Sequence, residues 1–278
     1  MQTIAGFTDR TTRVRDVDFH WQEWGADASP PMVLLHGLTG HAHIWDHMAP
    51  RLAQRYHLYA LDQRGHGDSG HPPTYTTQDF VDDLAAMRAY WGIDRFVLMG
   101  LSMGGHNAMA YAVQHPQHVA RLIVIDIPPR LTMDRSPSRP EQERLAREGH
   151  SNYADFEDAV RDARPDMLTA PEENLRYRTR WNLRTSEDGS MQFKYDARVQ
   201  AFWQPADLSA VLSKIDCPML LVRGGKTYAL PRDVAESMVA AVPDAGLVEV
   251  PDSGHSVPTD RPEDLTPLVI DWLARRQI

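Results

Sequence analysis

Short apolar runs recur along the chain, and between them apolar residues fall at helical spacing. Short runs rich in Val, Ile and Leu are typical of strands covered on both faces of a sheet. They predict strands at Met32–Leu35, Tyr56–Leu61, Phe96–Met99, Leu122–Ile127, Met219–Val222 and Leu247–Val250.

The stretches between these runs predict helices. One helix begins at Thr77, which is a suitable N-cap, and repeats apolar residues at helical spacing as far as Trp91. Further helices are predicted over Arg232–Val242 and Asp264–Arg275. Strands that alternate with helices indicate an α/β fold, with a doubly wound and mostly parallel sheet.

The alternation stops after Ile127 and resumes at "CPMLLVRGG". From Pro128 to about Asp207 the chain is polar, with helical patterns in "RPEQERLAREGH" and "NYADFEDAVRDARPDML" and a turn into a short extended piece at "SEDGSMQFKYD". We therefore predict a helical lid over residues 128–207, inserted into a core formed by residues 1–127 and 208–278. Such a lid would cover the carboxyl edge of the sheet, where open α/β sheets bind ligands.

Composition narrows the class of protein. With 29 Lys and Arg against 38 Asp and Glu, the net charge is −9, which disfavours a nucleic-acid partner. Cys217 is the single cysteine, so an internal disulfide is excluded and a reducing compartment is expected. No segment has the apolar length of a signal peptide or a membrane span. We expect a cytoplasmic protein without a membrane partner; its oligomeric state stays open.

The stretch "FVLMGLSMGGHNAMAY" carries the strongest chemical signal. A buried strand runs into Gly100-Leu101-Ser102-Met103-Gly104 and then directly into a helix. This is the G-x-S-x-G nucleophile elbow in its expected strand–turn–helix context. Gly100 and Gly104 remove side chains that would collide in the turn. Ser102 is therefore the candidate nucleophile.

Two other stretches supply partners for Ser102. In "VLLHGLTGHAHIW", Gly37 follows a predicted strand, so the backbone N–H groups of Leu38 and Met103 are candidates for an oxyanion hole. In "EVPDSGHSVPTDRPE", His255 lies in a glycine-flanked loop after the last strand, where it could act as the general base.

These motifs resemble the α/β-hydrolase fold family, in its lid-bearing serine esterase and C–C hydrolase branch. The resemblance rests on His36-Gly37, "DQRGHGDSG", "GLSMGG", "VIDIPP" and "SGH", and it spans nearly the whole chain outside the lid. It implies a Ser-His-acid triad, no cofactor and no metal. Dehalogenases and epoxide hydrolases of this fold carry aspartate at the elbow, so Ser102 argues against both chemistries.

The triad acid departs from the common pattern. Many members carry it after the penultimate strand, but "MLLVRGGKTYALP" offers no carboxylate there. Some relatives instead place it after the strand that follows the elbow helix, which here is Asp126. Asp233 is the alternative, although its place in the first turn of a helix explains it without catalysis. Thr227 is a candidate for supporting the triad by a hydrogen bond.

Three lid residues are candidates for substrate contacts. Tyr177 and Trp181 fall at i and i+4, a spacing that fits packing within the lid as well as contact with substrate. Arg180 shares a helix face with other arginines, which fits either solvent or a substrate carboxylate. His41, His43 and His47 suggest metal ligands, but their spacing fits the exposed start of a helix better.

The leading hypothesis is a hydrolase that cleaves a small carboxylic ester, lactone or amide through an acyl-enzyme on Ser102. The alternative within enzymes is hydrolysis of a C–C bond in a ring-cleavage product, or of an enamide, in aromatic or heteroaromatic catabolism. A ligand receptor on a hydrolase scaffold is the alternative from another class. The acyl group, the leaving group and the pathway do not follow from the sequence.

Overall fold

The computed structural model describes residues 4–131, 140, 143–144, 149 and 152–275. Its centre is an eight-stranded sheet with the order β1-β2-β4-β3-β5-β6-β9-β10. The strands β2 and β4 pair antiparallel, as do β1 and β2, and all other pairs in the sheet are parallel. The strands are β1 (Phe7–Val14), β2 (Val17–Trp24), β3 (Pro31–Leu35), β4 (His57–Leu61), β5 (Phe96–Leu101), β6 (Val119–Ile125), β9 (Met219–Gly224) and β10 (Ala245–Val250).

All six predicted strands are present, and the predicted doubly wound, mostly parallel sheet is confirmed. The prediction missed β1 and β2, which form the antiparallel edge of the sheet. Most residues of β1 are exposed, so this strand lacks the continuous apolar run used to find the others. In β2, "VDFHWQEW" does alternate apolar and polar residues over its first half, which is a usable strand signal.

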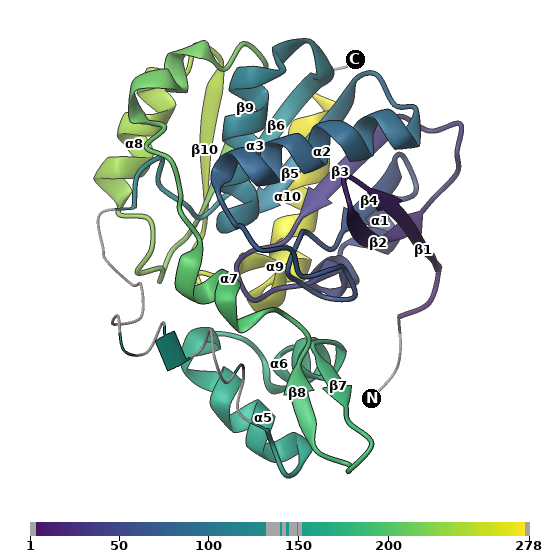
Figure 1. Ribbon diagram of the computed structural model, residues 1–278. Helices are drawn as coiled ribbons and strands as arrows, with labels where there is room; N and C mark the ends of the chain where they lie inside the picture. Colours follow the sequence, from purple (N-terminus) through teal and green to yellow (C-terminus); the bar gives the residue numbers. More distant parts are fainter. Residues whose placement is uncertain (1–3, 132–139, 141–142, 145–148, 150–151, 276–278) are drawn as a thin grey trace.

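Helices cover both faces of the sheet, because successive strand residues point to opposite sides. In β3, Val33 and Leu35 join the cluster that packs under α2 (Thr77–Trp91), α3 (Met103–Gln114) and α8 (Arg232–Ala241). Met32 and Leu34 join the opposite cluster, under α1 (Ala49–Leu52) and α10 (Pro262–Ala274). Figure 1 shows α2 and α3 in front of the sheet and α10 behind it.

Helix α2 begins at Thr77 as predicted, but its N-cap lies one residue earlier than predicted. The N-cap is Thr76 and not Thr77: its hydroxyl accepts a hydrogen bond from the N–H of Asp79, and the backbone N–H of Thr76 donates to the Asp79 carboxylate over 2.9 Å. This reciprocal pair is a capping box, and it needs the polar side chain one position earlier than we predicted.

The chain between β6 and β9 leaves the sheet and forms a cap at one end of the molecule (Figure 1). Its two ends meet where Leu208 N donates to the Pro129 carbonyl over 3.0 Å. The described elements are α5 (Phe156–Ala163), the 3-10 helix η3 (Arg164–Met167), α6 (Glu172–Trp181), the hairpin β7 (Leu183–Thr185) and β8 (Met191–Phe193), and α7 (Ala197–Phe202). The helix predicted from "RPEQERLAREGH" lies largely outside the described residues.

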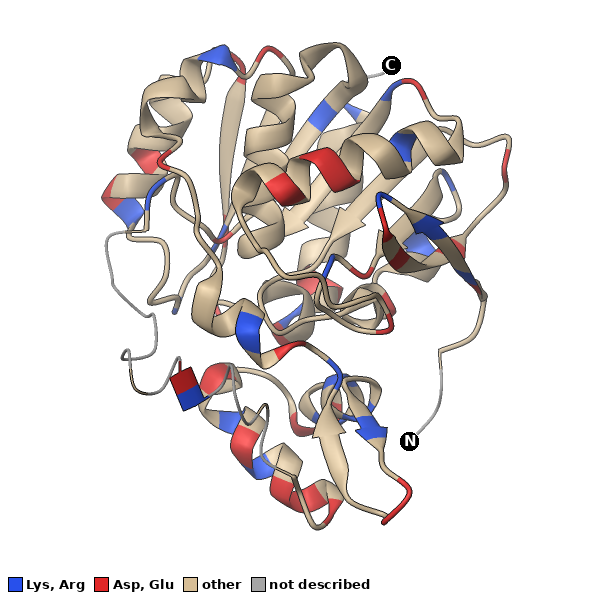
Figure 2. Ribbon diagram, in the orientation of Figure 1, with Lys and Arg blue, Asp and Glu red and all other residues tan. Residues whose placement is uncertain are grey.

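Charged residues of both signs are distributed along the whole ribbon, and the cap helix α5 carries acidic and basic residues together (Figure 2). None of the described helices is long and apolar enough to cross a membrane.

Candidate active site

Ser102 sits in the tight turn between β5 and α3, with φ 51° and ψ −121°. A non-glycine residue rarely adopts positive φ, and such strain is found where a turn must present a side chain. The turn is possible because two glycines bring backbones into contact. A Cβ on Gly100 would lie 2.3 Å from the carbonyl oxygen of Gly104, and one on Gly104 would lie 2.3 Å from that of Leu35.

Ser102 has a histidine and an aspartate in line behind it. Its Oγ lies 2.8 Å from Nε2 of His255, and Nδ1 of His255 lies 2.7 Å from Oδ2 of Asp126. The three residues come from the ends of β5, β6 and β10, which parallel pairing brings to the same edge of the sheet. Ser102 keeps 9% of its surface exposed, whereas Asp126 is fully buried.

Asp126 is held by hydrogen bonds on both carboxylate oxygens. Its Oδ1 accepts the N–H of Gly224 over 2.9 Å, and its Oδ2 accepts the Thr227 hydroxyl over 2.5 Å as well as the His255 bond. The residue has φ 53°, so its backbone also leaves the strand conformation at the end of β6. The carboxylate is therefore fixed in position and aimed at the imidazole.

The alternative acid, Asp233, lies elsewhere. It is exposed in the first turn of α8, where its charge favours the helix N-terminus. The loop after β9, where many relatives carry the acid, supplies Thr227 to Asp126 instead of a carboxylate of its own. The geometry thus brings Asp126 to His255, with Thr227 behind it.

The loop from Gly37 to Gly40 approaches Ser102 from the end of β3. A Cβ on Gly37 would lie 3.2 Å from the Ser102 Cβ, so the chain passes directly beside the serine. Gly40 N closes the turn on the Gly37 carbonyl over 3.0 Å, and Thr39 has φ 60°. Leu38 lies in this turn, and Met103 opens α3, where first-turn N–H groups have no intrahelical partner.

His36 stabilises the loop from Gly37 to Gly40 through its ring nitrogens, and it carries no charge at neutral pH. Burial lowers the pKa of His36 to about 4. Its Nδ1 lies 2.8 Å from the Gly37 carbonyl, so it donates there, while Nε2 accepts the N–H of Gln63 over 3.0 Å. His36 is therefore a neutral structural group.

The cap helix α6 is docked on the core through two side chains that were candidates for substrate contacts. The Tyr177 hydroxyl donates to Oδ2 of Asp46 over 2.6 Å, and Trp181 stacks on His43 with ring centroids 3.7 Å apart. Burial raises the pKa of the Asp46 carboxyl. These contacts give Tyr177 and Trp181 a packing role. The exposed position predicted for His43 is wrong, because α6 covers it.

The same helix is tied to both loops that flank Ser102. On one side, His41 Nε2 donates to the Arg178 carbonyl over 3.0 Å, and the Asn182 amide donates to the Thr39 carbonyl over 2.8 Å. On the other side, the Asn174 amide donates to the Thr259 carbonyl over 2.9 Å, just beyond the His255 loop. The helix therefore holds the serine-side loop and the histidine-side loop at a fixed separation.

Of the arginines on α6, the one singled out from the sequence points away from this region. The Arg180 guanidinium lies over the ring of Phe156 in the cap, 4.7 Å from its centroid. Its neighbour Arg178 is buried instead. The sequence does contain a signal for this, since Arg178 falls three residues after the buried Leu175 and so shares its face of the helix. The sequence-based prediction did not include Arg178, because Arg180 and the other arginines considered there share a different face of the helix.

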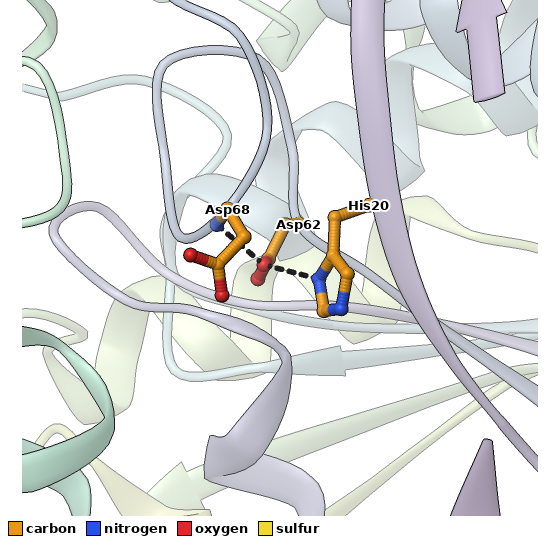
Figure 3. Close-up of side chains that lie close together, drawn as sticks. All are labelled: His20, Asp62 and Asp68. Atoms are coloured by element: carbon orange, nitrogen blue, oxygen red, sulfur yellow. Dashed lines mark hydrogen bonds and ion pairs between the residues drawn. The ribbon is translucent and has the colours of Figure 1, made fainter. Parts of the chain in front are cut away.

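A second histidine–carboxylate group lies where His20, in the middle of β2, meets Asp62, directly after β4 (Figure 3). His20, Asp62 and Asp68 are close enough together to be considered as metal ligands. However, Asp62 Oδ2 already accepts His20 Nδ1 over 2.7 Å and Asp68 N over 2.9 Å, and Oδ1 accepts Ala42 N over 2.6 Å. These bonds tie the loop after β4 to its neighbours, and they explain the cluster as a structural one.

Comparison with known proteins agrees with this geometry. A family model for the alpha/beta hydrolase fold matches residues 30–262. The chain is 30% identical to the sn-1-specific diacylglycerol lipase of Mus musculus over 262 residues, which cover 88% of this chain and 81% of the lipase. It is 29% identical to the N-formylmaleamate deformylase of Pseudomonas putida, with 87% of each chain covered.

A third relative and a solved structure that resembles this chain carry the name of the same activity. The 2-(acetamidomethylene)succinate hydrolase of Mesorhizobium japonicum is 24% identical, with 92% of each chain covered. A solved structure of E-2-(acetamidomethylene)succinate hydrolase superimposes with a TM-score of 0.83 at 23% identity, covering 96% of this chain and 99% of that one. All three relatives are named as hydrolytic enzymes, so the prediction of a hydrolase is confirmed. The chain belongs to the α/β-hydrolase fold family.

Proposed function

We propose that the protein is a serine hydrolase of small carboxylic esters, lactones or amides, with Ser102, His255 and Asp126 as its catalytic triad. The observation that carries this proposal is the unbroken chain of contacts from Ser102 Oγ through both ring nitrogens of His255 to Asp126. A serine hydroxyl becomes an effective nucleophile when a base takes its proton and a third group orients that base.

In the first half-reaction, Ser102 Oγ attacks the substrate carbonyl carbon while its proton passes to Nε2 of His255. The imidazolium that forms is stabilised by Asp126, because Nδ1–H already donates to its carboxylate. The N–H groups of Leu38 and Met103 hold the developing oxyanion. His255 then gives its proton to the leaving group, the bond from the carbonyl carbon breaks, and an ester to Ser102 remains.

In the second half-reaction, water attacks the acyl-enzyme. His255 takes a proton from the water, and the tetrahedral intermediate collapses to a carboxylic acid and free Ser102, whose proton returns from Nε2. The chain supplies every group these steps need, so the proposal requires no cofactor.

Hydrolysis of a C–C bond or an enamide is the second candidate. It is favoured by the relatives named 2-(acetamidomethylene)succinate hydrolase and N-formylmaleamate deformylase, which match most of this chain. The same three residues would serve such a reaction, so the triad does not distinguish it from ester cleavage. A panel of substrates does.

The test is labelling with a fluorophosphonate probe, followed by intact mass and peptide mapping. We expect one adduct on Ser102 in the native protein and none in Ser102→Ala. Turnover of esters, lactones, amides and ring-cleavage products then ranks the reaction types. A folded native protein that forms no adduct and turns over none of these substrates would contradict the proposal and favour a ligand receptor.

A further inference from the structure

Arg178 is a buried arginine on the cap helix α6, with 9% of its surface exposed. A guanidinium has five N–H donors, and a buried one is normally paired with a carboxylate. Only one donor of Arg178 is used within the described part of the chain: Nη1 donates to the Ser256 hydroxyl over 3.1 Å. That partner is neutral, so the positive charge is not matched by a contact.

No ion pair satisfies this charge among the described residues, since no carboxylate oxygen there lies within 4.0 Å of the guanidinium. The strongest acidic influence on Arg178 is that of Asp260, whose Oδ2 accepts hydrogen bonds from Thr169, Ser253 and Gly254 and whose Oδ1 is buried without a hydrogen-bond partner. Burial lowers the pKa of the Arg178 guanidinium although Asp260 and Asp166 act against it. A buried charge without an ion-pair partner destabilises the folded protein, so structural stability does not explain why an arginine occupies this position.

Two nitrogens of Arg178 have no protein partner among the described residues. Nε and Nη2 make no protein hydrogen bond among the described residues, yet they are not sealed from solvent as the orphaned nitrogens of the core are. Two adjacent N–H groups on one planar guanidinium match the two oxygens of a carboxylate.

The guanidinium also lies beside the catalytic groups. Ser256, which it contacts, directly follows His255. Its own backbone carbonyl is held by His41, next to the turn that carries Leu38. Tyr228, whose ring centroid is 5.6 Å from that of His255, also acts on the charge of Arg178. The free donors are therefore placed near the point where Ser102 would attack.

We propose that Arg178 binds a carboxylate of the substrate, so that the enzyme prefers acidic substrates, carrying a carboxylate besides the bond that is cleaved. This rests on the proposed function, because it assigns the substrate class of the Ser102 site. A carboxylate at Arg178 would complete the missing ion pair, and binding would be selective because a neutral analogue leaves the guanidinium unpaired.

The test compares matched pairs of substrates that differ by one charge. In the first pair, 4-nitrophenyl hydrogen adipate against 4-nitrophenyl methyl adipate, the carboxylate is in the acyl group. In the second, 4-acetoxybenzoate against methyl 4-acetoxybenzoate, it is in the leaving group. The pair that shows the preference tells which side of the substrate meets Arg178.

We expect the wild type to favour the acid in one pair, and Arg178→Gln to lower the acid-to-neutral ratio of kcat/KM by roughly 10- to 100-fold. Arg178→Lys should keep part of the preference, since it keeps the charge and loses the two-pronged geometry. Arg161→Gln removes a charge from an exposed position of the cap, where Arg161 pairs with Asp158, and should leave the ratio unchanged. A wild type without preference in either pair, or an unchanged ratio in Arg178→Gln, would overturn the inference.

A binding measurement separates this inference from the proposed hydrolysis. Adipate should raise the melting temperature of Ser102→Ala, and the rise should disappear in Ser102→Ala/Arg178→Gln but not in Ser102→Ala/Arg161→Gln. Failure of fluorophosphonate labelling with intact adipate binding would reject the hydrolase and keep the carboxylate site. Normal labelling with no rise in melting temperature would reject the carboxylate site alone.

Discussion

The Thr227 hydroxyl donates to Oδ2 of Asp126 over 2.5 Å, and the same oxygen lies 2.7 Å from Nδ1 of His255. The loop after β9 therefore supports an acid that comes from the end of β6. Thr227 Oγ1 also accepts the N–H of Ala229 over 3.0 Å, so its hydroxyl proton has one direction left and points at the carboxylate. We therefore expect Thr227 to position the acid of the proposed triad.

Replacing Thr227 with Val should slow turnover without unfolding the protein. The change keeps the shape and removes the hydroxyl, so one of the bonds that fix Asp126 is lost. We expect kcat to fall about 10-fold, equivalent to one hydrogen bond to a charged group. Thr227→Ser retains the hydroxyl and should restore most of the activity. Equal losses in both variants would mean that packing of the methyl group, and not the hydrogen bond, matters.

Asp126→Asn tests the acid directly. The amide keeps the size of the carboxylate but cannot hold the imidazole in the tautomer that accepts the serine proton, so kcat should fall by about 10⁴-fold. Asp233→Asn is the matched control, because Asp233 is the exposed alternative at the start of α8. It should retain wild-type kcat. Steady-state kinetics, with circular dichroism to verify folding, decides between the two residues.

The elbow glycines give a prediction for stability. A methyl group on Gly104 would lie 2.3 Å from the Leu35 carbonyl oxygen, and a backbone cannot yield as a flexible side chain does. Gly104→Ala should therefore lower the free energy of unfolding by about 3 kcal/mol.

Gly246 in β10 provides the control, because a Cβ there would meet nothing within 4 Å. Gly246→Ala should be neutral or slightly stabilising, since alanine suits a strand better than glycine. Denaturant titrations of both variants measure the difference. If Gly104→Ala is as stable as Gly246→Ala, the close approach at the elbow does not constrain the sequence.

The buried His20–Asp62 pair predicts a pH dependence of stability (Figure 3). Burial alone would lower the pKa of His20, but hydrogen bonds to Asp62 and Asp9 and the charges of Asp62 and Asp68 outweigh it and raise the pKa to about 9. The unfolded value is near 6.5. The folded state thus binds the proton more tightly, so this contribution is fully present below about pH 6.5 and is lost as the pH rises through about 9.

Denaturant unfolding of the wild type and His20→Gln at pH 6 and pH 9.5 checks this expectation. The stability advantage of the wild type over the variant should shrink by roughly 3 kcal/mol between the two pH values. The difference between the wild type and His20→Gln cancels the contributions of all other titrating groups, because both proteins contain them. An advantage that stays constant or grows with pH would show that His20 is not charged in the folded protein.

Local pattern was enough for much of the fold and for the nucleophile. Each buried strand of the parallel sheet is a short apolar run, because a strand covered on both faces must be apolar throughout. The elbow motif also occupies one short stretch: Gly100 lies against the backbone of Gly104, although the space that Gly104 needs is set by Leu35 at the end of β3. The exposed edge strand β1 was missed for the same reason, since solvent places little demand on its side chains.

The partners of Ser102 depended on more than local pattern. Asp126 directly follows β6, and Asp233 lies in the first turn of α8. Only the order of strands in the sheet places Asp126 beside His255. Thr227 was a candidate for a hydrogen bond to the triad. Its bond to Asp126 joins residues far apart in the sequence.

The roles of the cap residues were decided by tertiary structure alone. Tyr177, Arg178 and Arg180 lie within one helical turn, and although Arg178 shares a helix face with Leu175, this spacing does not tell which of the three contacts substrate. Docking of α6 on Asp46 and His43 turns Arg178 inward and leaves Arg180 on Phe156. The sequence by itself thus determined the sheet, the elbow and the class of reaction. The tertiary structure decided which side chains face Ser102, because that depends on packing between segments that the chain does not join.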